Sequence, residues 1–418
     1  MKTLISILIL VTLSVFSFGQ YVQQFEEPKN EGEKFDSLKI VVGGNFAMEF
    51  QGIKHKADTA LIPLGNGIVL PTANFNINGY LAKGVKVNLE TYLSARHHNE
   101  AWVKGGYLLI NQMPFFESPL VDKLMEYMTL KVGVMELNYG DAHFRRSDNG
   151  KVTTNPFVGN YIMDAFTVSL GLEIMYRNPN GFFGMLAGTN GTVNPSIVGF
   201  NSTTKKYSPY IMGDEVAWYT KWGYDKKFND DFRFRASLSG YFCENQHQGT
   251  LFSGDRAGSR YYLVMNKITK TSTDVDIKSN HTSGNWGPGT TNRLYAYQLN
   301  LFSKWKGLEF FGTYEYANNT LPSDITHKNY FYHQYAADLV YRFGKKEQFY
   351  GGARYNFVNN AKSLDMSIDR IQVAAGWYLN KYILAKVEYV TQKYNNFTDK
   401  YGSSAKFEGL IVEAAISF

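Results

Sequence analysis

Basic side chains that could bind anions recur at alternate positions of several strand-like segments. Arg233 and Arg235, for example, alternate with apolar residues within the segment 232–242. The candidates of this kind are Lys131, Arg233, Arg235, Arg354 and Arg370. A guanidinium group offers a fork of N–H donors that fits a carboxylate or a phosphate group, and an ammonium group attracts both as a point charge. This pattern therefore indicates attraction of small anions.

Acidic side chains share the face that carries these cations. They are Glu49, Glu90, Glu173, Glu309, Glu315 and Glu388. The cations on this face, which also include Lys39, Lys86 and Lys386, are slightly more numerous. Two interpretations remain open: a surface that favours anions, or ordinary charge pairs on a wet wall, which contribute little individually.

No residue pattern indicates catalysis, a bound metal or a cofactor. The chain has no G-x-S-x-G segment, and a hydrolase would have to use Ser239 with His247 as nucleophile and base. The other histidines show no spacing typical of metal ligands. We therefore expect no catalytic residues, no metal and no cofactor.

Apolar residues recur at every second position along most of the chain. In the last segment, 407–418, Leu410, Val412, Ala414 and Ile416 share one face. A period of two predicts strands with one apolar face and does not fit helices. After residue 19 no run of about 18 apolar residues occurs, so no helical membrane span is expected.

Very short connections alternate with long ones. Lys306–Gly307 joins two strand-like segments directly, whereas 244–292 is long and rich in Gly and Ser. Outer-membrane barrels show this asymmetry, with short periplasmic turns and long outer loops. We predict an all-β fold, a transmembrane antiparallel up-and-down barrel over 38–418, with 16 strands (18 possible). Within the long connections we expect a short helix at 120–127 and one strand at 261–265.

The start of the chain predicts export. Met1-Lys2 is followed by an almost wholly apolar stretch, and Ser17-Phe18-Gly19 offers small residues for cleavage. We interpret 1–19 as a signal peptide. The polar segment 20–37 follows without periodicity, and we expect it to be a periplasmic leader.

Composition fits the same class. Aromatic residues make up 16% of the chain, with 30 Tyr and 30 Phe, which suits ring girdles at two membrane interfaces. The mean hydropathy of −0.29 fits strands that are half lined by water. The net charge of +6 is compatible with lipopolysaccharide or anionic solutes and is too weak to indicate nucleic acid. Cys243, the only cysteine, excludes an intramolecular disulfide.

A resemblance to a known family lies in two neighbouring stretches, YGDAHFRRSDNG at 139–150 and NPFVGNY at 155–161. They resemble proteins of the phosphate-selective porin O and P group, especially its distant relatives in Bacteroidetes. The resemblance implies a sixteen-stranded barrel with a constriction loop folded into it, on which Arg145 and Arg146 could bind phosphate or carboxylate. The chain lacks the dense Lys/Arg ladder of the phosphate-specific members. The alternative is an outer loop that is paired internally through its own aspartates.

Together these observations predict a passive outer-membrane pore for small hydrophilic solutes that favours anions. The alternatives are an outer-membrane transporter for hydrophobic substrates and an outer-membrane lipid hydrolase. Expected partners are membrane lipid, lipopolysaccharide and small anionic or polar solutes. Phe418 resembles the C-terminal signature that the barrel-assembly machinery reads, and resemblance to porins implies a homotrimer. The solute is not indicated.

Overall fold

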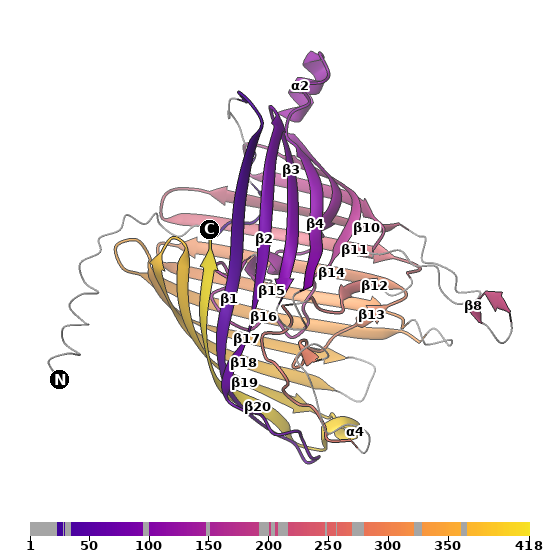
Figure 1. Ribbon diagram of the computed structural model, residues 1–418, viewed down its shortest axis with the longest axis vertical. Helices are drawn as coiled ribbons and strands as arrows, with labels where there is room; N and C mark the ends of the chain where they lie inside the picture. Colours follow the sequence, from indigo (N-terminus) through magenta and orange to yellow (C-terminus); the bar gives the residue numbers. More distant parts are fainter. Residues whose placement is uncertain are drawn as a thin grey trace.

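Sixteen antiparallel strands close into a barrel in chain order (Figure 1). The computed structural model of the protein describes residues 23–27, 29, 35–94, 100–147, 151–191, 200–201, 205–207, 216–246, 249–255, 257–269, 280–321, 328–360 and 366–418. The barrel strands are β1 (Lys39–Lys56), β2 (Gly67–Ala82), β3 (Val85–Ser94), β4 (Glu100–Ile110), β5 (Met128–Glu136), β6 (Val168–Arg177), β7 (Phe182–Thr189), β10 (Ala217–Lys227), β11 (Phe232–Cys243), β14 (Leu294–Trp305), β15 (Leu308–Asn319), β16 (Tyr330–Phe343), β17 (Phe349–Asn360), β18 (Ser367–Asn380), β19 (Ile383–Asn395) and β20 (Ala405–Ser417). The predicted fold class and the count of sixteen strands are confirmed.

The remaining elements lie in the connections. They are α2 (Pro119–Met125), α4 (Thr398–Tyr401), the 3-10 turn η1 (Ala142–Arg145), and the short strands β8 (Phe200–Asn201), β9 (Lys206–Tyr207), β12 (Gly249–Phe252) and β13 (Gly289–Thr291). Helix α2 confirms the helix expected near 120–127. The strand expected at 261–265 is wrong, because Leu263 and Met265 have φ angles of 64° and 61°, which an extended strand excludes. Among the described residues, no helix has the length and apolar character needed to cross a membrane.

Strand β16 illustrates how the alternating sequence builds the wall. Its outward row includes Tyr335, Leu339 and Tyr341, and its inward row includes Asp338 and Arg342. Leu339 is 53% exposed, whereas Asp338 is 1% exposed. Because successive side chains of a strand point to opposite faces, this sequence places apolar groups outside and charged groups inside.

Aromatic rings gather on the outer surface at the end of the barrel that carries the short turns. There, Phe343 stacks on Tyr341 and Phe349, and Phe349 in turn stacks on Trp377, with ring centroids 5.7 to 6.2 Å apart. We call this end, which also holds the start of β1 and the end of β20, the turn end, and the opposite end the loop end. Amphipathic rings in such a belt suit the boundary between lipid and water.

The barrel closes where β1 pairs with β20 in antiparallel register, with Asn45 opposite Ser417. Gly44 and Phe418 exchange two backbone hydrogen bonds of 3.0 and 2.9 Å. The ring of Phe418 covers Gly44, so that a Cβ atom there would lie 2.8 Å from its Cζ atom. A side chain at position 44 would therefore have to displace the Phe418 ring.

Replacing Gly44 by valine is expected to lower the free energy of unfolding by roughly 1–3 kcal/mol, because the added side chain collides with the Phe418 ring. Urea titration of the folded protein in detergent micelles measures this change. The double variant G44V/F418A should be about as stable as F418A alone. A G44V protein as stable as the unmodified chain would contradict the explanation.

Candidate functional site

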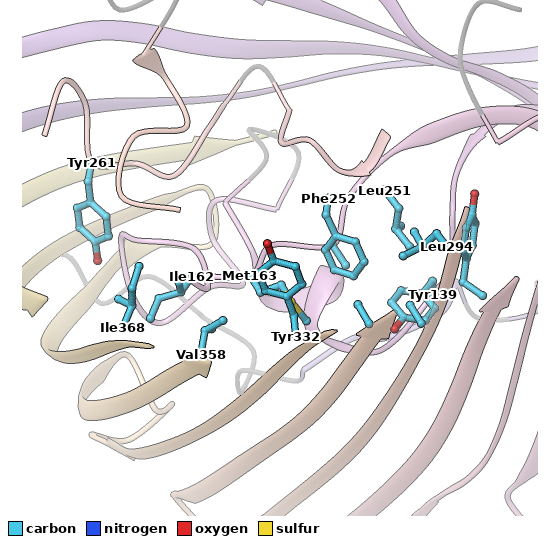
Figure 2. Packing of buried hydrophobic residues seen from close by; sticks show 14 of the residues in the cluster. Tyr139, Ile162, Met163, Leu251, Phe252, Tyr261, Leu294, Tyr332, Val358 and Ile368 are labelled. Atoms are coloured by element: carbon cyan, nitrogen blue, oxygen red, sulfur yellow. The ribbon is translucent and has the colours of Figure 1, made fainter. Parts of the chain in front are cut away.

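Two chain segments enter the barrel and fill much of its centre. We call them together the inner plug: the first segment is 137–147 with 151–167, and the second is 251–255, 257–265 and 280–287. Ile162 and Met163 of the first segment and Phe252 of the second belong to one buried apolar cluster. Figure 2 shows these side chains beside Tyr332 and Val358 of the barrel wall.

Polar side chains of the wall hold the first plug segment by its backbone. The amide of Val158 donates to Glu388 at 2.8 Å, and the amide of Ile162 donates to Asn356 at 2.7 Å. The amide of Met163 donates to the wall residue Gln334 at 3.0 Å. The stretch that carries the family resemblance therefore folds into the barrel, as the resemblance implies.

The centre of the barrel is not an open, water-filled space in the part of the lumen that the plug occupies. A barrel of sixteen strands would leave an aqueous channel if its connections stayed outside. Here the long connections contain apolar residues such as Val158, Ile162 and Val264, which bury against one another instead of facing water. Strand periodicity does not reveal this, because the packing residues lie in irregular segments.

Arg145 and Arg146, the two candidates from the resemblance, are fully buried in the plug. Arg145 donates to Glu309 of the wall at 2.5 Å. Arg146 forms ion pairs with Asp164 at 2.6 Å and Asp255 at 3.0 Å, and so joins the two plug segments. Burial alone would lower the pKa of Arg146, but these two carboxylates raise it well above its ordinary value. Both guanidinium groups thus face carboxylates of the chain itself.

Arg235 faces inward from β11 and binds Asp141 of the plug through two hydrogen bonds of 2.8 Å. Lys221 of β10 donates to the same carboxylate at 3.0 Å, and Ser237 donates at 2.6 Å. Burial alone would raise the pKa of Asp141, but Arg235 and Lys221 lower it far below its usual range. Asp141 therefore binds the wall rather than its own loop, while the other aspartate of the loop, Asp148, lies outside the described residues.

The other three arginine candidates also face inward and have partners within the chain. Arg233 pairs with Asp225 at 2.7 Å. Arg354 pairs with Asp338 at 2.6 Å. Arg370 donates to Gln392 at 2.5 Å and, like Arg354, donates to a plug carbonyl group. The structure thus brings all six arginines to the barrel interior, and Arg145, Arg235, Arg354 and Arg370 each connect the wall with the plug.

Lys131 is placed differently, because it lines a polar cavity that the plug leaves open along strands β2 to β6. This cavity, which we call the lumenal cavity, has a volume of about 570 Å³. Its charged lining consists of Lys86, Lys104, Lys131 and Lys151 together with Glu26, Glu27, Glu90, Glu136 and Glu173. The ammonium group of Lys131 lies 4.3 Å from the ring centre of Tyr107.

Lys104 and Lys151 also line the cavity, although neither is among the candidates that the sequence indicates. Lys104 points inward because of a bulge, since Glu90 pairs with Gly105 whereas Thr91 pairs with Val103. The broken alternation at this place in β4 is the signal that could have identified it. Lys151 belongs to the plug, and only the folded loop brings it to the cavity.

His143 borders the lumenal cavity on the plug side. One ring nitrogen contacts Glu136, and the other lies 3.0 Å from the amide oxygen of Asn138. Burial lowers the pKa of His143 to about 4, against the opposing effect of Glu136. The imidazole is therefore neutral near pH 7 and adds no cation to the cavity.

Of the residues considered for a hydrolase, the structure describes Ser239. Ser239 is 1% exposed and lies on the inward row of β11, away from the outer surface where a lipid would lie. His247 lies outside the described residues. The geometry therefore gives no support to lipid hydrolysis.

Comparisons with known proteins agree with the fold. No protein-family model and no curated protein matches the chain. Among solved structures, an anion-selective porin from Comamonas acidovorans shares 9% identity and a TM-score of 0.54, over 91% of this chain and 100% of that one. The outer membrane channel DcaP of Acinetobacter baumannii shares 10% identity and a TM-score of 0.51, over 93% of this chain and 99% of that one. The chain therefore has the barrel fold that is found in outer-membrane porins.

Proposed function

We propose that the protein is an outer-membrane channel for passive diffusion of small hydrophilic solutes, with a preference for anions. The observation that carries this proposal is the polar lumenal cavity inside a closed barrel whose outer surface is apolar. Such a surface suits lipid, and a charged cavity beside the plug suits water and small polar solutes. The lining also disfavours the alternative of a transporter for hydrophobic substrates, which would need an apolar path.

Lys131 is the residue that we propose attracts anions. Other cations of the lumenal cavity are bound to carboxylates: Lys104 lies 2.9 Å from Glu90, and Lys151 lies 2.5 Å from Glu136. Within the described residues, no ion pair of Lys131 is found. We therefore propose that its charge is available to a passing anion, and that the buried Arg145 and Arg146 fasten the plug.

Replacing Lys131 by glutamate is expected to shift the reversal potential of the channel, measured under a salt gradient in planar bilayers, towards cation preference. The reason is that the change inverts the charge beside the path of the solute. The matched control is K381E, the same charge inversion in the exposed β18–β19 turn outside the cavity lining. Cation preference of the unmodified protein, or an unchanged potential in K131E, would refute the role of Lys131.

The remaining expectations are consistent with this proposal. Lipid and lipopolysaccharide would contact the apolar outer surface, and Phe418 would be the residue that the barrel-assembly machinery reads. A homotrimer stays a prediction, which chemical cross-linking of the membrane-embedded protein would test. Cleavage after residue 19 is a prediction that N-terminal analysis of the exported protein would test.

A further inference from the structure

A short piece of the leader crosses the turn end of the barrel and is held there by wall and plug residues. We call residues 23–27 the strap. Arg233 donates to the backbone carbonyl of Gln23 at 2.5 Å, and Arg145 donates to its side chain at 3.1 Å. At the other end of the strap, Lys86 of β3 pairs with Glu27. The strap therefore spans from β3 to β11 across the mouth.

Glu26 of the strap lies in a site that is built for an anion. Arg235 donates two hydrogen bonds to its carboxylate, at 2.6 and 2.8 Å. Lys221 and Arg177 lie 3.6 and 3.5 Å from the same carboxylate. Paired donors of one guanidinium group on one carboxylate are the geometry by which arginine recognises carboxylate and phosphate groups.

Phe25 anchors the strap beside this site. Its ring centre lies 5.3 Å from that of Phe302 and 5.8 Å from that of Phe144, and the Arg235 guanidinium lies 4.3 Å above the Phe25 ring. The side chain of Phe25 is almost fully buried. The strap is thus held by ring contacts at Phe25 and by ion pairs at Glu26.

Cations outnumber carboxylates around Glu26. The cluster consists of the cations Arg177, Lys221, Arg233 and Arg235 and the carboxylates Glu26, Asp141 and Asp225. Withdrawal of Glu26 would leave four cations facing two carboxylates. Arg235 and Lys221 are buried, and burying cations without their anion is unfavourable, so another anion would be drawn to the vacated place.

The strap also separates two cavities. The lumenal cavity lies on one side, and a second cavity of about 410 Å³ lies on the other, at the turn end beside Asn178 and Arg233. Gln24, Phe25 and Glu26 line both cavities. Movement of these three residues would therefore join the cavities into one path.

We propose that the Arg235–Lys221 site is a binding site for small carboxylate or phosphate anions, in which Glu26 stands for the ligand. A solute anion that enters this site displaces the strap and opens the turn end of the channel. The displaced strap leaves Arg235, Lys221 and Arg177 to the solute. This inference rests on the proposed channel function, and it gives the anion preference a second location beside Lys131.

Competition, rather than mild acid, is the means of release that the geometry favours. Burial alone would raise the pKa of Glu26, but Arg235 and Lys221 lower it to about 2, with an opposing effect of Asp141. The carboxylate therefore stays ionised and paired with Arg235 throughout ordinary pH.

The test follows the position of the strap without relying on conduction. Gln23 is 1% exposed, so a cysteine placed there in a Cys243→Ser background should react slowly with a neutral maleimide. Adding Glu26→Gln to this chain should accelerate the reaction at least about tenfold, because hydrogen bonds to a charged group contribute roughly 1.5–3 kcal/mol. In the protein that retains Glu26, succinate and phosphate should accelerate labelling, and the rate should saturate with their concentration. Chloride at equal ionic strength should not accelerate labelling. The matched control is Asp230→Asn, which removes an exposed carboxylate from the β10–β11 turn.

Conductance in planar bilayers is measured in parallel on the full chain, with Glu26→Gln and Phe25→Ala both expected to raise it. Labelling that E26Q, succinate and phosphate leave unchanged would overturn the anion site. Faster labelling with unchanged conductance would overturn the role of the strap in opening the channel and leave the anion site standing. Anion-dependent labelling in a protein that conducts in no variant would support the site while refuting the channel function.

Discussion

Replacement of Arg146 by alanine is expected to loosen the inner plug by about 3–5 kcal/mol, because it leaves the carboxylates of Asp164 and Asp255 buried without their cation. The effect should be local, since these contacts join the two plug segments. Hydrogen exchange at the amides of Val158 and Ile162, which donate to the barrel wall, measures the free energy of plug release.

Two comparisons separate this effect from a general loss of charge. K227A removes the partner of Asp230 from an exposed ion pair and should change plug exchange very little. The variant R146A/D164N/D255N carries neutral amides in place of the two carboxylates and should recover part of the lost free energy of plug release. An R146A protein whose plug amides exchange as slowly as those of the unmodified chain would show that the Arg146 pairs do not hold the plug.

Removal of the plug core should raise single-channel conductance severalfold. Replacing residues 156–163 by a Gly-Ser linker of equal length removes the apolar groups that fill the centre, including Val158, Ile162 and Met163. The wall residues that this exposes include the charged Glu388 as well as apolar residues such as Val358. A sixteen-stranded barrel without packed connections leaves an aqueous channel.

The control for this experiment replaces residues 200–207, the region of β8 and β9, by a linker of equal length. These strands form a separate two-stranded sheet, and β8 lies well outside the barrel (Figure 1). Their replacement should leave the conductance unchanged. Equal conductance in the plug variant and the unmodified protein would mean that solutes do not pass through the region that the plug occupies.

The E26Q variant and the 156–163 linker variant open different parts of the channel. The strap controls the turn end through Glu26, whereas the plug narrows the centre along its whole first segment. A variant that combines E26Q with the 156–163 linker should therefore conduct more than either change alone, if both lie on the path of the solute.

The local alternation of apolar and polar residues was sufficient to predict the barrel. In β16, Tyr335, Leu339 and Tyr341 face outward and Asp338 faces inward, as a period of two requires. Each strand carries its own signal, and short turns such as Lys306–Gly307 bring neighbours together directly. Most strand positions could therefore be predicted, and the strand number to within two.

Alternation of apolar and polar residues does not predict where the irregular segments lie. Tyr261 to Met265 contains apolar residues that resemble a strand, but their backbone turns through left-handed conformations to enter the plug. Lys104 reaches the cavity only because a bulge shifts the register between β3 and β4. Such features depend on partners far away in the chain, and no local pattern specifies them.

By itself, the sequence determined that the wall has an apolar outside and a charged inside, because side-chain direction in a strand follows from position alone. Only the tertiary structure decided which inward charges are available to a solute. Arg146 meets a carboxylate from a distant loop, while Lys131 lines the lumenal cavity beside the Tyr107 ring. The pairing of a buried charge is a property of the folded neighbourhood, and it determines what that charge can bind.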